Sequence, residues 1–228
     1  TPDGRRVMWA WLTTAGPHGE LLHKTVQSLP RELSLREDGT LRIAPVRELE
    51  SLRGTPTILN DVLLAHPLTG HGGHVPPNQP PMLQAIATLP SDACELRVTV
   101  ARQEANRKLF GLVLFADEHG NGLPLMFRPE TGTIRLGSTE APLAMTDLPE
   151  REDVELRIFV DRYLVEVFVN DRQALVAAFP GYGDRREIRA FTVGAPTKIE
   201  RLEMWPLQPT NEGHLQAKES RVWQPRTE

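Results

Sequence analysis

Alternation of apolar and polar side chains dominates the chain from residue 95 onward. It runs through LRVTV (96–100), VELRIFV (154–160) and YLVEVFV (163–169). Because only an extended strand sends successive side chains to opposite sides, each run predicts a half-buried β-strand. The expected inner-face residues are Leu96, Val98, Val100, Val154, Leu156, Ile158, Val160, Tyr163, Val165, Val167 and Val169, opposite Arg97, Thr99, Glu155, Arg157, Phe159, Leu164, Glu166 and Phe168.

Turn residues separate these strands at short intervals. Asp161-Arg162 and Asn170-Asp171 each join two neighbouring runs. Asn and Asp tolerate the left-handed backbone that tight hairpin turns need. Repeated short strands with turns at this spacing predict an all-β chain, an antiparallel two-sheet β-sandwich of the jelly-roll or concanavalin-like kind.

Three further segments carry different patterns. FGLVLFA (110–116) is apolar on both faces, which predicts a central strand between two packed layers. In PVRELESLR (45–53), Pro45 occupies a typical first helical position and apolar residues recur three apart, which predicts one or two helical turns. The tract 66–81 is rich in Gly and Pro without periodicity, so we expect a loop.

Composition excludes several classes of partner. The net charge is −4, from 26 basic and 30 acidic residues, and the chain has no basic run of the kind that binds nucleic acid or an anionic membrane surface. No apolar stretch approaches the roughly 20 residues of a membrane helix. The single cysteine, Cys94, excludes an internal disulfide and leaves the cellular compartment undetermined. The chain starts at Thr1 rather than Met, so we expect the natural polypeptide to be longer.

Polar candidates for a metal or catalytic site are weak. His66, His71 and His74 lie in the Gly/Pro tract, and imidazoles can converge on zinc or copper. A solvated loop is the favoured interpretation, so we expect no metal and no cofactor. Asp161 and Glu166 lie close to one hairpin, but a turn position and a polar strand position predict solvated carboxylates. No Gly-x-Ser-x-Gly motif or phosphate-binding glycine loop occurs.

Tryptophans are the strongest binding candidates. Trp9 and Trp11 stand in GRRVMWAWL (4–12), and their spacing places both on one face of a strand. They could stack on sugar rings or fill an interface with another domain or a second chain. Trp205 is expected in the core or an interface, and Trp223 lies in the polar C-terminal tail.

Two separated blocks of sequence match the pattern of one enzyme family. The second block is LRIFVDRYLVEVFVND (156–171), followed by MWPL (204–207). The first comprises GRR (4–6), Trp9, Trp11, SLPREL (28–33), DGTL (38–41), PVREL (45–49) and LR (52–53). In content and order these blocks resemble glycoside hydrolase family 32, the invertases, levanases and other β-fructosidases. One departure is Arg172, which follows the Asn-Asp turn where the family usually has Gly.

The resemblance implies a domain organisation. It predicts terminal strands of a five-bladed β-propeller and a junction over 1–35, a linker with a short helix over 36–53, a β-sandwich over 54–208 and a polar tail over 209–228. The strand at GRRVMWAWL would close a propeller blade, with its tryptophans facing the rest of the propeller.

The resemblance also implies that the chain is not catalytic by itself. In the family the nucleophile, transition-state stabiliser and acid belong to Trp-x-Asn-Asp-Pro-Asn, Arg-Asp-Pro and Glu-Cys motifs, and none of these occurs here. Cys94-Glu95 has the reversed order and lies on a predicted sandwich strand, so no catalytic residue is assigned. We expect the chain to support the catalytic propeller of a β-fructosidase, as its partner, and to form a homodimer if its apolar strand is otherwise uncovered. A stand-alone carbohydrate-binding or lectin-like module is the alternative.

Overall fold

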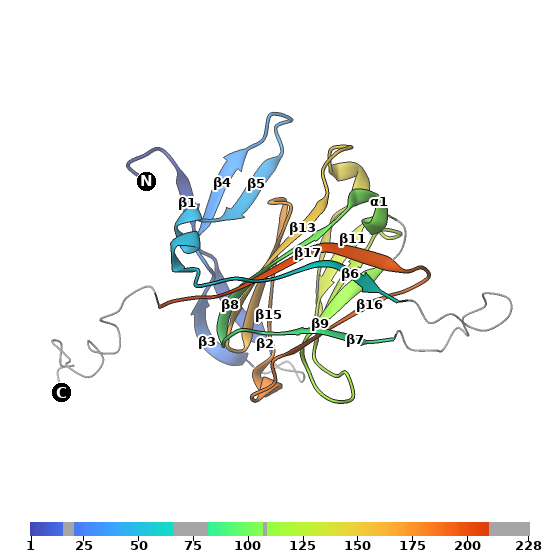
Figure 1. Cartoon of the computed structure of the whole chain (residues 1–228). Coiled ribbons are helices and arrows are strands. Elements are labelled where there is room, and N and C mark those ends of the chain that lie inside the picture. Colours follow the sequence, from blue (N-terminus) through green and yellow to red (C-terminus); the bar gives the residue numbers. More distant parts are fainter. Residues whose placement is uncertain (16–20, 66–81, 107–108, 210–228) are drawn as a thin grey trace, which may run out of the picture.

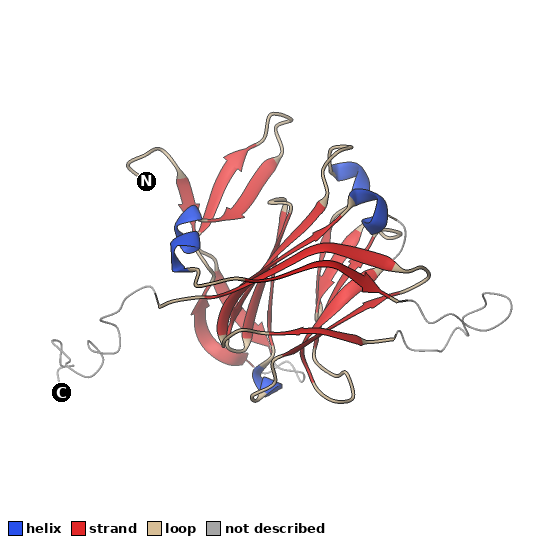
Figure 2. Cartoon of the chain, viewed as in Figure 1, coloured by secondary structure: helices blue, strands red, loops and turns tan. Residues whose placement is uncertain are grey.

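Two six-stranded antiparallel sheets pack face to face in a computed structural model that describes residues 1–15, 21–65, 82–106 and 109–209. Figure 1 shows the two layers, and Figure 2 shows that helices are confined to a few short turns. The first sheet has the order β12-β11-β10-β9-β16-β7, with bounds Thr139–Pro142, Thr133–Leu136, Leu123–Arg128, Phe110–Ala116, Glu187–Thr192 and Gln84–Thr88. The second has the order β15-β14-β13-β8-β17-β6, with bounds Gln173–Ala178, Leu164–Val169, Val154–Asp161, Ala93–Val100, Thr197–Pro206 and Thr57–Leu64.

The core lies between the sheets and contains the predicted inner faces. Leu96, Val98 and Val100 of β8 are fully buried there, as is Val154 of β13. Strand β9, the predicted central strand, is buried at every position and pairs with β10 on one side and β16 on the other. The two-sheet β-sandwich predicted from the alternation is thus confirmed.

The prediction of half-buried strands is wrong for β13 and β14. Their supposed solvent-facing residues Arg157, Phe159 and Phe168 are 9%, 4% and 1% exposed. The cause is a second layer of chain: the described part of residues 1–53, here named the N-terminal segment, covers this outer face. Apolar residues of the segment, among them Val46 and Leu49, pack against the edge-to-face pair Phe159 and Phe168.

The N-terminal segment forms two small sheets. One has the order β1-β4-β5 and the other pairs β2 with β3. The prediction of a single strand at GRRVMWAWL is therefore wrong. The chain leaves one sheet at Trp9 and Ala10 and enters the other. The bounds are β1 Arg6–Met8, β2 Trp11–Ala15, β3 Leu21–Gln27, β4 Arg31–Leu35 and β5 Leu41–Pro45.

The predicted helix near residue 45 exists but starts later. It is the 3₁₀ helix η1 (Arg47–Leu52), whereas Pro45 is the last residue of β5. Pro45 pairs with Arg31 in the β4–β5 ladder, so the residue that the sequence pattern assigned to the helix belongs to the sheet. The remaining short helices are α1 (Arg102–Ala105), η2 (Met145–Asp147) and η3 (Pro180–Tyr182).

The predicted left-handed turn after β14 is confirmed. Asn170 and Asp171 have φ of 47° and 51°, and the amide of Arg172 donates to the carbonyl of Val169 at 2.8 Å. The turn before β14 is displaced by one residue, because Asp161 still pairs with Leu164 and the turn positions are 162–163. The Gly/Pro tract 66–81, and with it the three candidate histidines, lies outside the described residues, as does Trp223.

Candidate functional site

Two buried carboxylates mark the outer face of the second sheet. Glu95 of β8 and Glu166 of β14 are 0% and 3% exposed. Both lie opposite Phe159 of the intervening strand β13, so the three residues form one row across the sheet. Since neighbouring strands are about 4.8 Å apart, the two carboxylate-bearing backbones are roughly 10 Å apart. The N-terminal segment covers this row.

Glu166 is held by β4 and the residues that precede it. The Leu29 amide donates to its Oε1 at 2.6 Å, and Arg31 Nη2 donates to its Oε2 at 2.8 Å. The Arg31 guanidinium also lies 5.5 Å from the centre of the Phe168 ring. Burial raises the pKa of Glu166, while the Leu29 amide and Arg31 act in the opposite direction.

Glu95 is the centre of a larger network. Arg53, just after η1, binds both of its carboxylate oxygens at 2.7 Å, and Arg157 donates to Oε1 at 2.9 Å. The planar guanidinium of Arg53 also lies 4.3 Å from the Trp205 ring centre. Glu50 adds a second, more exposed carboxylate at 3.4 Å from Arg53 and 3.6 Å from Arg157.

This arrangement binds chain segments together, with both Glu95 and Glu166 held in ion pairs with arginine. A retaining glycosidase holds two carboxyl groups about 5 Å apart with the scissile bond between them. Here Phe159 occupies the space between Glu95 and Glu166, and both carboxylates are committed to arginine. Charged groups inside proteins are usually paired with an opposite charge and hydrogen-bonded to it.

The interpretation of Glu166 as a solvated carboxylate is therefore wrong. Alternation correctly placed it on the outer face of its strand, but another part of the chain covers that face. Asp161, the other member of the supposed pair, is exposed at the end of β13 as expected. Arg31 and Arg53, which bind the buried carboxylates from the N-terminal segment, were not predicted as functional; their only sequence signal was membership of the motifs SLPREL and LR.

The tryptophans fall into two environments. Trp205 is 8% exposed and packs beneath Arg53 and Arg97, in agreement with the expected interface or core position. Trp9 and Trp11 are 56% and 70% exposed. They flank the point where the chain passes between the two small sheets, and their rings are available for contact with another surface.

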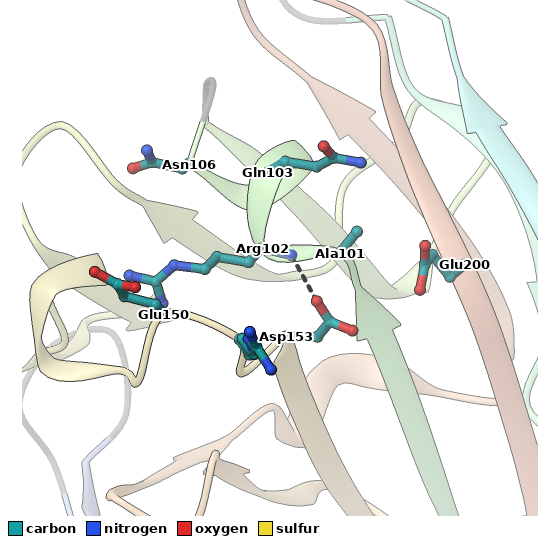
Figure 3. Close-up of a pocket in the computed structure, with 8 residues that line it drawn as sticks. Ala101, Arg102, Gln103, Asn106, Glu150, Asp153 and Glu200 are labelled. Carbon is teal, nitrogen blue, oxygen red and sulfur yellow. Dashed lines mark hydrogen bonds between the residues drawn. The ribbon is translucent and has the colours of Figure 1, made fainter.

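A polar hollow of about 560 Å³ lies near α1 (Figure 3). Arg102 belongs to it, but its guanidinium donates to the carbonyls of Met145 and Pro149, and its amide donates to Asp153. The hollow offers no aromatic face for a sugar ring. Its lining comprises Ala101, Arg102, Gln103, Asn106, Glu150, Arg151, Asp153 and Glu200.

Metal and thiol chemistry find no support in the part of the chain that the structure describes. Within those ranges no group of three or more His, Cys, Asp or Glu side chains is placed to hold a metal ion. Cys94 is fully buried, and burial raises the pKa of its thiol to about 12.

No helix in the described ranges is long and apolar enough to span a membrane.

Comparisons with known proteins agree on one family. The family model described as "Glycosyl hydrolases family 32 C terminal" matches residues 48–206. The raffinose invertase of Escherichia coli is 30% identical over an alignment of 217 residues that covers 90% of this chain and 40% of that protein. The levanase of Bacillus sp. (strain L7) is 30% identical over 254 residues, with 97% of this chain and 24% of that protein covered. The chain thus spans less than half the length of these relatives.

Solved structures show the same fold. The fructosyltransferase from A. japonicus matches with a TM-score of 0.66 at 18% identity, over 91% of this chain and 41% of that one. Fructan 1-exohydrolase IIa from Cichorium intybus, in complex with 1-kestose, matches with a TM-score of 0.64 at 17% identity, over 91% and 46% of the two chains.

Removal of one partner of the Arg31–Glu166 pair is expected to destabilise the chain. Arg31→Met leaves a buried carboxylate without its cation, which costs about 3–5 kcal/mol of unfolding free energy. The double variant Arg31→Met/Glu166→Leu should recover part of this loss, because it removes the buried charge although it also leaves the Leu29 amide without its acceptor. Urea unfolding measures both values, with Arg201→Gln, which disrupts an exposed ion pair with Glu203, as the control. Equal losses of unfolding free energy in Arg31→Met and in the double variant would contradict the prediction.

The raised pKa of Glu166 predicts the direction in which the stability of the fold changes with pH. A carboxyl whose folded-state pKa exceeds its unfolded value of about 4.3 contributes stability below that value, and the contribution is lost as pH rises through the folded-state pKa. The stability of the wild type relative to Glu166→Gln should therefore be higher near pH ~4 than near pH ~8. Urea midpoints of both proteins at the two pH values test this, and a difference of opposite sign would mean that Arg31 outweighs burial.

Proposed function

The chain belongs to glycoside hydrolase family 32 and contains its C-terminal domain, and from this premise we propose that it is the non-catalytic β-sandwich portion of a β-fructosidase-type enzyme. The parent enzyme would hydrolyse terminal fructosyl bonds in sucrose or fructans. The role of this chain would be to support the catalytic β-propeller, its partner in that enzyme. The observation that carries the proposal is the pair of buried carboxylates, each bound to an arginine of the N-terminal segment.

The buried contacts favour a supporting role because they fix the N-terminal segment rigidly on the sandwich. Arg31 is the first residue of β4 and Arg53 follows η1, so these ion pairs attach the segment at two places that are far apart in its sequence. A planar guanidinium that binds both carboxylate oxygens fixes orientation as well as distance. A strand attached to the segment would thereby be held in a fixed position relative to the sandwich.

We propose boundaries that follow from this role. Residues 1–35 would be terminal propeller strands and the junction, 36–53 a linker and 54–208 the sandwich, with a tail over 209–228. The boundary between 53 and 54 is supported by the sheets, since strands β6 to β17, from Thr57 to Pro206, make up both six-stranded sheets, whereas the boundary between 35 and 36 falls inside the β4–β5 hairpin. The N-terminal strands pair only among themselves within the described residues.

The exposed tryptophans supply the surface for the partner in this proposal. Trp9 and Trp11 project from the segment that the buried ion pairs hold in place, and large exposed aromatic side chains are typical of residues that dominate interfaces. Their exposure also favours the second candidate function, stacking on the apolar face of a sugar. A second copy of the chain is the third occupant of the same surface.

The chain alone is expected to be inactive. Purified protein incubated with sucrose, inulin or levan should release no fructose, because the family's nucleophile and acid motifs are absent from its sequence and its buried carboxylates are bound to arginine. An intact invertase under the same conditions serves as the positive control. Measurable fructose release by the chain would overturn the proposal.

Replacement of both exposed tryptophans separates the candidate partners. In a polypeptide that joins this chain to its catalytic propeller, Trp9→Ala/Trp11→Ala should lower the melting temperature of the propeller, since each interface anchor is worth ~2 kcal/mol or more. Leu63→Ala, at a residue that is 60% exposed on β6, is the matched control and should leave it unchanged. An unchanged melting temperature of the propeller in the double tryptophan variant would contradict this supporting role. Saturable fructan binding by the chain, lost in the same variant, would favour the carbohydrate-binding function.

A further inference from the structure

A groove of about 520 Å³ lies between the β4–β5 hairpin and the end of the sandwich. In Figure 1 the hairpin projects beside the turns at that end of the sheets. The groove is separate from the Arg31–Glu166 and Arg53–Glu95 contacts. Its lining comprises Leu35, Arg36, Glu37 and Asp38 from the hairpin, Pro149 from the loop after η2, and Arg172 from the β14–β15 turn.

Arg172 is buried without a close counter-charge. Its side chain is 9% exposed, yet the nearest carboxylate oxygen, Asp38 Oδ2, is 4.0 Å from Nη1. Among the residues that the structure describes, the guanidinium donates one hydrogen bond, from Nη1 to the Thr40 hydroxyl at 3.4 Å, and its buried Nε has no acceptor. Arg53, by contrast, has two carboxylate oxygens at 2.7 Å. Most N–H donors of Arg172 are therefore left without a close acceptor among the described residues.

Arg36 adds a second incompletely satisfied cation to the same groove. Its Nη2 donates to the carbonyl of Asn170 at 3.0 Å, its Nη1 lies 3.6 Å from Glu152, and its Nε has no acceptor. Arg42, which is nearby, does not add to this excess because Asp171 binds it at 2.6 Å. Glu37 and Asp38 also line the groove, and their negative charges oppose any anion that does not lie close to the two arginines.

We propose that this groove binds a small oxyanion of the phosphate class between Arg36 and Arg172. The carboxylates nearest these two guanidiniums are at 3.6 and 4.0 Å, so their charges are incompletely compensated, and an oxyanion in the groove would supply a closer charge and further acceptors. The fork of N–H donors on arginine fits the oxygens of phosphate and carboxylate better than a spherical ion. Leu35, which is 69% exposed, and Pro149 give the groove an apolar wall for the organic part of a phosphate ester.

The test is a titration of the complete chain with inorganic phosphate, followed by thermal unfolding and isothermal titration calorimetry. Phosphate should raise the melting temperature above that in sodium chloride of equal ionic strength, because a ligand that binds only the folded state stabilises it. Arg172→Gln should lose the phosphate-dependent shift and at least tenfold in affinity. Arg128→Gln, whose arginine makes a long 3.5 Å contact with Glu140 away from the groove, is the matched control and should keep the shift.

A second ligand identifies what the groove binds, and a second variant replaces Arg172→Gln if that variant does not fold. Glucose 6-phosphate that binds more tightly than phosphate indicates an ester whose organic part contacts Leu35 and Pro149, whereas equal affinity indicates the phosphate group alone. Arg172→Lys retains the charge and should keep part of the affinity if Arg172→Gln proves unstable. Chloride and phosphate that act equally at matched ionic strength, or a full phosphate shift in folded Arg172→Gln, would overturn the proposal.

Discussion

Burial of two carboxylates on the outer face of one sheet is the constraint on which the rest of this structure depends. Glu95 and Glu166 lie where an isolated sandwich would meet water, and they are buried only because the N-terminal segment covers them. Each then requires a cation, and the segment supplies Arg53 for one and Arg31 for the other. Removal of the segment would expose the apolar residues around both carboxylates, so segment and sandwich form one folded unit.

The choice of charged rather than apolar residues at this interface affects specificity more than stability. A buried ion pair gains little over a well-packed apolar pair of the same volume, because desolvation offsets the attraction. Apolar surfaces, however, can slide across one another, whereas Arg53 must meet both oxygens of Glu95 and stack on Trp205 at the same time. We infer that the ion pairs fix the position of the segment, and that packing of Val46 and Leu49 against Phe159 and Phe168 supplies most of the attraction.

The sequence was a good guide to the sandwich and a poor guide to this interface, for one physical reason. Period-two alternation reports which side chains leave each face of a strand, and it correctly assigned Val154 and Glu166 to opposite faces. It carries no information on what covers a face, so the outer faces of β13 and β14 were wrongly expected to be solvated. The cover comes from residues more than 100 positions earlier, and no local pattern reports contacts of that range. The break of GRRVMWAWL into two strands was missed for the same reason, since pairing partners decide where a strand ends.

The family motifs carried the information that periodicity lacked. SLPREL contains the arginine that binds Glu166, and LR contains the segment's arginine that binds Glu95, so these motifs coincide with two of the contacts that attach the segment to the sandwich. The tryptophans of the same block remain largely exposed. One stretch of sequence therefore combines residues that bind inward to the sandwich with residues that face outward. In the proposed role of this segment, the inward contacts would fix its position on the sandwich and the outward tryptophans would meet the neighbouring domain.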